Sequence, residues 1–72
     1  MNTITINKEP VELYKILKFE GLVGTGGEAK AVISEGLVTL NGKIETQKRK
    51  KILHGDKVTF AEKEYCIVLE KD

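Results

Sequence analysis

Residues 3–6, with the sequence TITI, alternate between polar and apolar side chains near the start of the chain. This alternation predicts a short strand whose isoleucines share one face. Pro10 follows, at a position where the first residue of a helix tolerates proline because its N–H would have no partner in the helix. Apolar residues then recur at helical spacing over residues 11–20, and Gly21 is suited to end a helix. The pattern predicts one strand followed by one helix.

A glycine-rich loop, GLVGTGG at residues 21–27, separates this helix from a second one. Thr25 and Glu28 fit a capping box, in which each side chain satisfies a backbone N–H at the start of a helix, so the second helix is expected to begin near Gly26. Gly36 is suited to end it. Its buried face would contain Ala29, Val32 and Ile33. Two helices joined by so short a loop are expected to pack against each other.

The second half of the chain has the pattern of strands and turns. Asn41-Gly42 is a strong hairpin signal. A two-residue loop would pair polar with apolar side chains, whereas a three-residue loop that includes Lys43 would place Leu40 opposite Ile44. We expect the three-residue loop, because it keeps both apolar side chains on one face, with Lys43 projecting from the turn.

Two more strands are expected after the hairpin. A turn at residues 54–56, His-Gly-Asp, precedes a strand in which Val58 and Phe60 share a face. The last strand, residues 65–69, has an unbroken apolar run that predicts burial on both faces. Cys66 within it is expected to be a buried structural thiol rather than a nucleophile. Helices followed by strands predict an α+β fold.

The bulk composition fits one small domain. The chain has 72 residues, of which 40% are hydrophobic, and this size suits a single domain over residues 1–72. No apolar run approaches the roughly 20 residues that cross a bilayer, and the first ten residues lack the pattern of a signal peptide. A single cysteine cannot form an internal disulfide or a four-ligand zinc site. We expect a cytoplasmic protein with no membrane partner, metal or cofactor.

The net charge of +1 hides a separation of charge along the chain. Residues 43–57 contain six cations and two acids and so carry +4, whereas the remainder carries −3. Four of the cations are consecutive, at residues 48–51. Such a run is often only a solvated loop, but it can also turn one face of a small protein toward a polyanion. Cations along a ridge match the phosphates of a nucleic acid, and Arg49 can grip a phosphate with two donors.

The aromatic residues decide which kind of nucleic acid is favoured. The chain has two tyrosines, two phenylalanines and no tryptophan. Most of these four residues, Tyr14, Phe19, Phe60 and Tyr65, are expected to be needed for the core, which disfavours stacking on single-stranded bases. Docking of folded or double-stranded RNA by charge and shape is favoured instead.

The residues that could support catalysis are isolated from one another. His54 has no partner nucleophile nearby in the sequence and is predicted to be a loop residue. The GTGG loop at residues 24–27 could present backbone N–H groups to a phosphate, but it lacks the lysine and spacing of a nucleotide-binding P-loop. No metal-ligand spacing occurs. We therefore expect a protein that is not an enzyme and has no small-molecule substrate.

The order of these features resembles a known family. Residues 11–43, VELYKILKFEGLVGTGGEAKAVISEGLVTLNGK, and residues 54–58, HGDKV, resemble the S-four domain, the RNA-binding module named after the fourth protein of the small ribosomal subunit. The short stand-alone bacterial members, the YbcJ-like or YaaA-like proteins, share the Gly-Gly-x-Ala-Lys start of the second helix and the later basic stretch. The resemblance implies an alpha-L motif: two helices packed on a small, curved, mostly antiparallel sheet, with RNA along the helices and the hairpin.

Carried over by position, the resemblance implies a set of RNA-facing residues, to which the charge pattern adds the basic stretch. These residues are Lys30, Asn41, Gly42, Lys43, Lys48, Arg49, Lys50 and Lys51, with Lys18 near the end of the first helix as a further candidate. One position departs from the family. Many members have an arginine just after the capping residue of the second helix, where this chain has Gly26. Either the basic stretch compensates for that arginine, or the RNA or its affinity differs.

We interpret the sequence as a non-enzymatic RNA-binding protein that docks structured RNA, such as ribosomal or tRNA-like RNA, in connection with the ribosome or translation. The alternative is a small adaptor whose basic loop binds an acidic protein, and such a partner would survive ribonuclease treatment. A sulfur carrier or ubiquitin-like protein is disfavoured, because the printed sequence ends in Glu-Lys-Asp rather than Gly-Gly.

Overall fold

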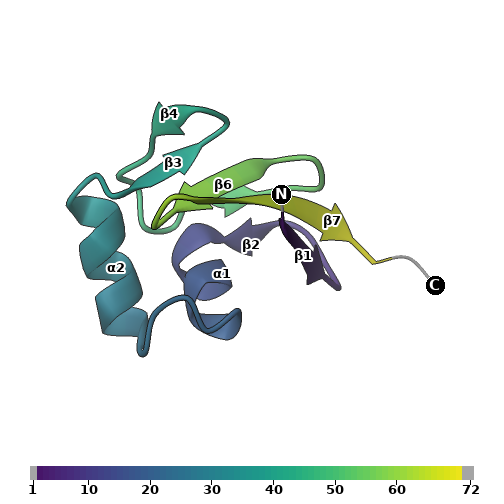
Figure 1. Cartoon of the computed structure of the whole chain (residues 1–72). Helices are drawn as coiled ribbons and strands as arrows, with labels where there is room; N and C mark the ends of the chain where they lie inside the picture. The colour runs from purple at the N-terminus through teal and green to yellow at the C-terminus, as the bar shows by residue number, and fades with distance from the viewer. Residues whose placement is uncertain (1, 71–72) are drawn as a thin grey trace.

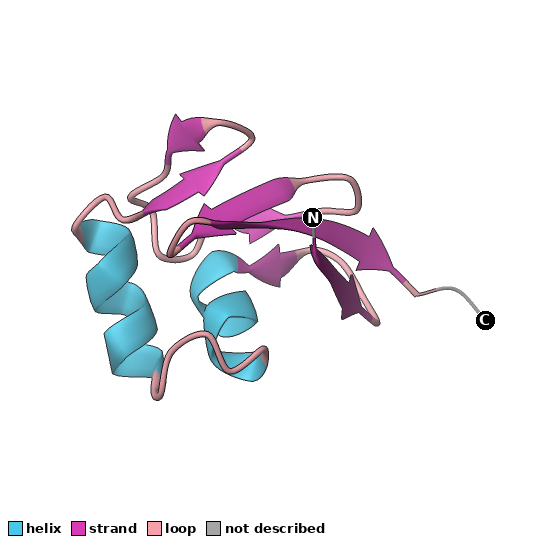
Figure 2. Cartoon of the chain, in the orientation of Figure 1, coloured by secondary structure: helices cyan, strands magenta, loops and turns pink. Residues whose placement is uncertain are grey.

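Two helices lie side by side against one face of a five-stranded sheet in the computed structural model, which describes residues 2–70 (Figure 1). The helices are α1 (Leu13–Phe19) and α2 (Gly26–Ser34). The strands of the sheet are β1 (Asn2–Ile6), β3 (Val38–Leu40), β4 (Lys43–Ile44), β6 (Lys57–Phe60) and β7 (Lys63–Leu69). A separate two-stranded sheet pairs β2 (Val11–Glu12) with β5 (Lys51–Ile52). Figure 2 shows the helices and the large sheet as separate layers.

The large sheet has the strand order β1-β7-β6-β3-β4. Only the β1–β7 pair is parallel, and the three remaining pairs of this sheet are antiparallel, within the part of the chain that the structure describes. The helices occupy one face of it, so the α+β class and the mostly antiparallel sheet expected from the sequence are confirmed. No helix within residues 2–70 has the length and apolarity to cross a membrane.

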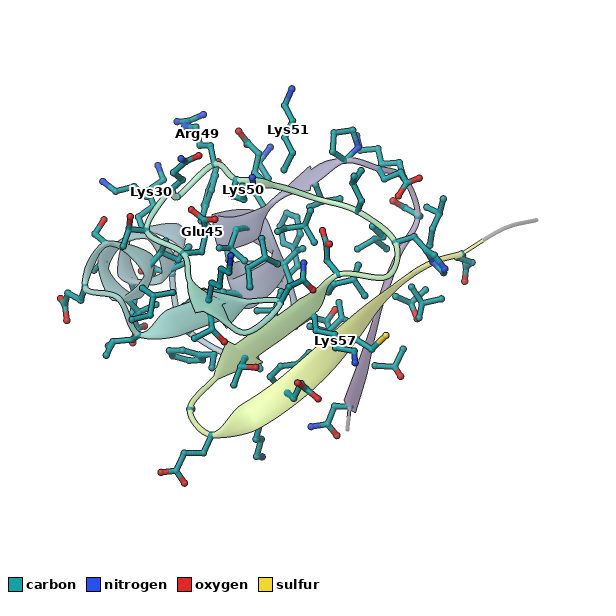
Figure 3. The ribbon with its side chains drawn as sticks, turned by 90° about the horizontal axis from the view of Figure 1, so that it is seen from above. Lys30, Glu45, Arg49, Lys50, Lys51 and Lys57 are labelled. Carbon is teal, nitrogen blue, oxygen red and sulfur yellow. The ribbon has the colours of Figure 1, made fainter. Side chains whose placement is uncertain are left out.

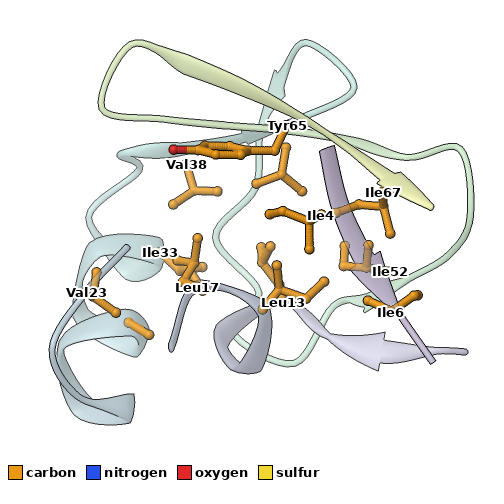
Figure 4. Close-up of a cluster of buried hydrophobic side chains, with 13 residues drawn as sticks. Ile4, Ile6, Leu13, Leu17, Val23, Ile33, Val38, Ile52, Tyr65 and Ile67 are labelled. Carbon is orange, nitrogen blue, oxygen red and sulfur yellow. The ribbon is translucent and has the colours of Figure 1, made fainter. Parts of the chain in front are cut away.

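The hydrophobic core fills the space between the helices and the sheet (Figure 4). Ile4 and Ile6 share the buried face predicted for the first strand, with exposed fractions of 2% and 8%. The largest fully buried side chains come from both layers and are Leu13, Leu17, Ile33, Ile52, Ile67, Val38 and Val58. Each contributes about 1.5–3 kcal/mol by leaving water. The core therefore holds together segments from both halves of the chain.

The second helix begins as predicted, with one change in its cap. Thr25 Oγ1 accepts a hydrogen bond from Glu28 N at 3.0 Å. Glu28 Oε1 accepts from Gly24 N at 2.8 Å, rather than from the capping residue itself. Both hydrogen bonds still supply partners for backbone donors at the start of the helix. Gly36 ends the helix region with a φ of 79°, a conformation that glycine adopts without strain.

The first helix begins later than the sequence predicted. Residues 11–12 form β2 instead of a first turn, so the prediction that Pro10 opens the helix was wrong. Glu12 precedes the helix but makes no side-chain cap. The first two N–H groups, of Leu13 and Tyr14, donate instead to the carbonyl oxygens of Lys50 and Lys48, at 2.9 and 3.1 Å. The acceptors lie more than 30 residues away in the sequence, so local spacing could not reveal them.

The hairpin register also differs from the prediction. Leu40 pairs with Lys43, and the loop contains only Asn41 and Gly42. Both loop residues have positive φ, 51° and 87°, as the tightest hairpin turns require. The prediction failed because β4 lies at the sheet edge, where Lys43 and Ile44 are both exposed. With neither side chain buried, the hydrophobic face does not select the register.

The last strand is longer and less buried than predicted. It begins at Lys63, directly after a two-residue turn in which Ala61 and Glu62 both have positive φ. Tyr65 and Ile67 are buried on the helix side, but Cys66 between them is only half-buried. The expectation of a fully buried thiol was therefore wrong. Alternation along the strand places Cys66 on the opposite face from its buried neighbours.

Candidate nucleic-acid interface

The four cations at residues 48–51, here called the basic run, are fixed to the start of α1 through their backbone. Two of their carbonyls accept the first N–H groups of α1, and Lys51 pairs with Glu12 in the small sheet. The next residue, Ile52, is fully buried. With its backbone bonded inward, the basic run directs its four side chains to solvent, where all four residues are exposed. The loop therefore has a defined position on the fold.

Figure 3 shows Lys30, Arg49 and Lys51 along one side of the molecule. Lys30 comes from α2, more than 15 residues before the basic run in the sequence. Lys57, although it belongs to the basic segment 43–57, lies apart from these residues on β6. The positive charge counted along the sequence is thus only partly collected on one face, and Lys30 is added to it by the fold.

An aromatic ring lies among these cations. The Nζ atom of Lys30 lies 4.8 Å from the centroid of the Tyr14 ring, and the Cζ atom of Arg49 lies 5.7 Å from it. Lys15 Nζ lies 6.0 Å from the same centroid. These distances are within the range of cation–π attraction. We call Tyr14, Lys15, Lys30 and Arg49 the Tyr14 cluster.

Two members of the Tyr14 cluster were missed from the sequence. Tyr14 was assigned to the core, and the structure does pack its half-buried side chain against the core, but the ring also contacts cations. The buried residues of α1 are Leu13, Ile16 and Leu17. Tyr14 lies at the edge of this apolar stripe, and that position could have indicated a ring that is only partly buried. Lys15 follows it and was not proposed at all.

One acidic residue, Glu12, contacts cations of the Tyr14 cluster. Glu12 Oε1 lies 3.3 Å from Lys15 Nζ, and Glu12 Oε2 lies 3.7 Å from Arg49 Nη1. The Glu12 side chain is 28% exposed and that of Arg49 is 67% exposed, so each pair contributes about 0–1 kcal/mol. Glu12 therefore offsets only part of the positive charge of the cluster, which has three cations around one carboxylate.

The hairpin is tied to the second turn by side-chain hydrogen bonds. Asn41 Oδ1 accepts from Lys57 N at 2.9 Å, and Asn41 Nδ2 donates to Asp56 Oδ1 at 3.1 Å. The other Asp56 oxygen accepts from Leu53 N at 2.8 Å. The Asn-Gly and His-Gly-Asp segments, which carried much of the family resemblance, thus form one hydrogen-bonded unit. Both polar atoms of the Asn41 amide are used within the protein.

An open hollow of about 650 Å³ lies between the hairpin and the basic run. Lys43 from β4 lines it together with Lys50 and Lys51, and the acidic residues Glu45 and Asp56 are also in its lining. Exposed apolar side chains, Ile44 and Leu53, are also in its lining. The hairpin lysine thus lines the same hollow as two residues of the basic run.

Lys18 and Gly26 meet at the other end of the helix pair. The Cδ atom of Lys18 lies 3.8 Å from the position that a Cβ atom on Gly26 would occupy. Lys18 Nζ lies 6.0 Å from the ring centroid of Phe19, which is 69% exposed. Lys18 therefore brings a cation to the neighbourhood of Gly26, the position at which the family resemblance implied an arginine. It does not belong to the Tyr14 cluster.

His54 makes two hydrogen bonds that stabilise the second turn. Its Nδ1 atom accepts from Leu69 N at 3.0 Å, and its backbone N donates to Glu9 Oε2 at 2.8 Å. These bonds join the turn to β7 and to the segment after β1. Among the described residues, no group of three or more histidine, cysteine or acidic side chains is placed to hold a metal ion.

Comparison with known proteins gives consistent matches over nearly the whole chain. The family model for the S4 domain matches residues 4–68. YbcJ of Escherichia coli strain K12 is 47% identical over 62 residues, which cover 85% of this chain and 89% of that protein. YbcJ of Shigella flexneri matches with the same identity and coverage.

Solved structures share the fold. The solution structure of E. coli YbcJ matches with a TM-score of 0.71 and 43% identity, over 94% of this chain and 87% of that one. It is described as revealing an αL motif involved in RNA binding. The crystal structure of 30S ribosomal protein S4e from Thermoplasma acidophilum also has a TM-score of 0.71, but at 23% identity and over 39% of its chain it supports the fold alone. With this fold, the family model over residues 4–68 and the 47% identity to YbcJ, the chain belongs to the S4 domain family.

Proposed function

We propose that this protein is a single-domain, non-enzymatic RNA-binding protein of the cytoplasm. The observation that carries the proposal is the anchoring of the basic run to α1 through the carbonyls of Lys48 and Lys50, with Arg49 and Lys30 both close to the Tyr14 ring. The description of YbcJ as having an αL motif involved in RNA binding supports the same function. Structured RNA, such as ribosomal or tRNA-like RNA, is the proposed target, and a connection with the ribosome or translation is part of the proposal.

The proposed mechanism is recognition of charge and shape. Exposed cations pair with phosphates and release counterions, which makes the affinity depend on salt. If about four to six phosphates are engaged, the logarithm of the association constant falls with the logarithm of salt concentration at a slope of about −3 to −5. Because the contacts are to the backbone of a folded RNA, they position the protein more than they read sequence.

The proposed contact residues lie on three parts of the fold. They are Lys18 and Lys30 on the helices, Gly42 and Lys43 on the hairpin, and Lys48, Arg49, Lys50 and Lys51 in the basic run. The structure leads us to propose a different role for Asn41, whose amide is already hydrogen-bonded to Lys57 and Asp56. We assign it to holding the hairpin in place beside the RNA-binding residues.

The test compares two variants of equal charge by fluorescence anisotropy with a labelled RNA hairpin. One variant is Lys48→Glu with Arg49→Glu, in the basic run, and its matched control is Lys57→Glu with Lys63→Glu, on β6 and β7. The basic-run variant is expected to bind at least ten-fold more weakly, and its salt slope to be shallower by about 2. The control is expected to lose far less RNA affinity. Circular dichroism shows whether both variants remain folded.

If both folded variants lost RNA affinity equally, net charge rather than the position of the basic run would govern binding. Absence of RNA binding by the unmodified protein would refute the proposed function itself. A pull-down with and without ribonuclease addresses the adaptor alternative, because an acidic protein partner would remain bound after the RNA is destroyed.

A further inference from the structure

We propose that Tyr14 is a positioning residue that gathers Lys15, Lys30 and Arg49 into one phosphate-binding subsite. The proposal rests on the proposed RNA-binding function and deepens it: the ligand is a phosphate group of the RNA backbone, and the residues that hold it come from three separate segments. Neither Tyr14 nor Lys15 belongs to the contact residues proposed above.

The geometry of the Tyr14 cluster supports this role. Tyr14 and Lys15 lie on α1, Lys30 lies on α2, and Arg49 lies in the basic run. All three cationic groups lie within 4.8–6.0 Å of one ring centroid. The Tyr14 side chain is half-buried against the core, and around its ring lie two half-buried lysines, Lys15 and Lys30, and the exposed Arg49. Long lysine and arginine side chains have many rotamers, whereas a ring packed against the core has few. The ring face therefore provides a common attachment for cations that the chain alone would leave independent.

The charge balance of the cluster points to an anionic ligand. Three cations repel one another around the ring, and one carboxylate, that of Glu12, lies within 4 Å of two of them. The cluster and Glu12 together carry a formal charge of +2. Glu12 does not contact Lys30, the cation nearest to the ring, among the ion pairs of the described residues. A phosphate between Lys30 and Arg49 would relieve the repulsion and accept several charge-assisted hydrogen bonds.

The arrangement also explains why a folded RNA would be preferred over a free anion. A single phosphate contacts only this subsite, whereas an RNA strand continues from it to the rest of the basic run. The cations at Lys50 and Lys51 line the adjacent hollow with Lys43. The subsite therefore sets the position of one phosphate, and the neighbouring cations add further contacts along the same backbone.

The test exchanges Tyr14 for two residues of different character. Tyr14→Phe keeps the aromatic face, and Tyr14→Leu keeps apolar packing but removes the ring. In the hairpin-RNA assay, the Phe variant is expected to bind within about two-fold of the unmodified protein. The Leu variant is expected to bind about five- to ten-fold more weakly, with a salt slope shallower by about 1, because the cations no longer converge. Equal binding by both variants would overturn the proposal.

A double-mutant cycle separates positioning from general stability. In a Lys30→Gln background, Tyr14→Leu is expected to weaken RNA binding by at most about two-fold, because the cation nearest to the ring is already absent. Combined with Lys43→Gln, on the hairpin, it is expected to keep its full effect. The same loss in both backgrounds would show that Tyr14 acts through stability alone, and would refute the positioning role even if one variant were poorly folded.

Inorganic phosphate supplies a second readout in the unmodified protein. Its titration is expected to shift the ring resonances of Tyr14 and leave those of the buried Tyr65 unchanged. Failure of this inference is distinguishable from failure of the proposed function. If the Lys48/Arg49 reversal weakens RNA binding while Tyr14→Leu does not, only the subsite is wrong. If the unmodified protein binds no RNA, both proposals fail.

Discussion

Replacing Asn41 by glycine distinguishes a structural role for this residue from a direct RNA contact. Its amide joins the hairpin to the second turn through Lys57 N, at 2.9 Å, and Asp56 Oδ1, at 3.1 Å. Asn41→Gly removes both hydrogen bonds while tolerating the backbone, which has a φ of 51° at this residue. Asn41→Ala removes the same bonds and adds the cost of a positive φ. We predict that both variants are less stable and that alanine is the worse of the two.

The magnitude follows from the contacts that are lost. Two hydrogen bonds of about 0.5–1.5 kcal/mol each amount to about 1–3 kcal/mol. Because the site is exposed and water can replace the lost partners, we expect the loss for glycine in the lower part of this range, at about 1–2 kcal/mol. The left-handed conformation adds about 1–2 kcal/mol for alanine. In a domain of this size, 1 kcal/mol corresponds to about 4–8 °C in Tm, so glycine is expected to lower Tm by roughly 4–16 °C.

Thermal unfolding followed by circular dichroism measures the stability of each variant. The salt dependence of RNA binding reports how many phosphates each variant contacts. Well below its Tm, the glycine variant is expected to keep the salt slope of the unmodified protein and to bind RNA within about three-fold, because no cation is removed. A glycine variant of unchanged Tm that binds RNA ten-fold more weakly would contradict the structural role. Asn41 would then contact RNA directly, as the family resemblance implied.

Three further predictions concern the helix termini and Glu12, the acid that contacts the Tyr14 cluster. Glu12→Gln frees Arg49 from its ion pair and is expected to strengthen RNA binding by about two- to five-fold in the anisotropy assay; weaker binding would show that Glu12 is needed to orient Arg49. Gly36→Ala places alanine at a φ of 79° and is expected to destabilise the protein by about 1–2 kcal/mol in denaturant unfolding. Gly27→Ala lies inside α2, where the nearest atom to the added Cβ is 3.8 Å away, and is expected to stabilise the protein by about 0.5–1 kcal/mol in the same measurement. Thr25→Ala removes the cap of α2 and is expected to cost about 1 kcal/mol, and an unchanged midpoint would contradict the capping role.

The local elements of the fold were predictable because their signals are local. The alternation at residues 3–6 and the capping pair Thr25 and Glu28 both describe contacts between near neighbours in the chain. Gly36 and the Asn-Gly turn were recognised for the same reason, since a positive φ is a property of one residue. The errors arose where the deciding contact is distant, as at the start of α1, or where no burial selects the register, as at the edge strand β4.

The candidate site was predictable as a set of charges but not as an arrangement. Lys30 and the basic run were identified from sequence, whereas Lys15 was missed and Tyr14 was assigned only to the core. Asn41 was expected to face RNA, and the structure shows its amide bonded to two partners within the protein. The place of Tyr14 among cations from three segments produces no periodicity or motif in the sequence. It can be recognised only in the folded protein, where these segments come together.

The sequence alone determined the α+β class, the two helices, the hairpin and the presence of four adjacent cations, because each depends on spacing within a few residues or on formal charge. Tertiary structure decided where those cations lie. Lys48 and Lys50 provide carbonyl acceptors for α1 across more than 30 residues, and Lys30 reaches the ring of Tyr14 from another helix. The N–H groups at the start of α1 have no acceptor in their own helix, and the carbonyl oxygens of the basic run supply two. Together with the pairing of β2 with β5 and the burial of Ile52, these bonds hold the basic run beside α1.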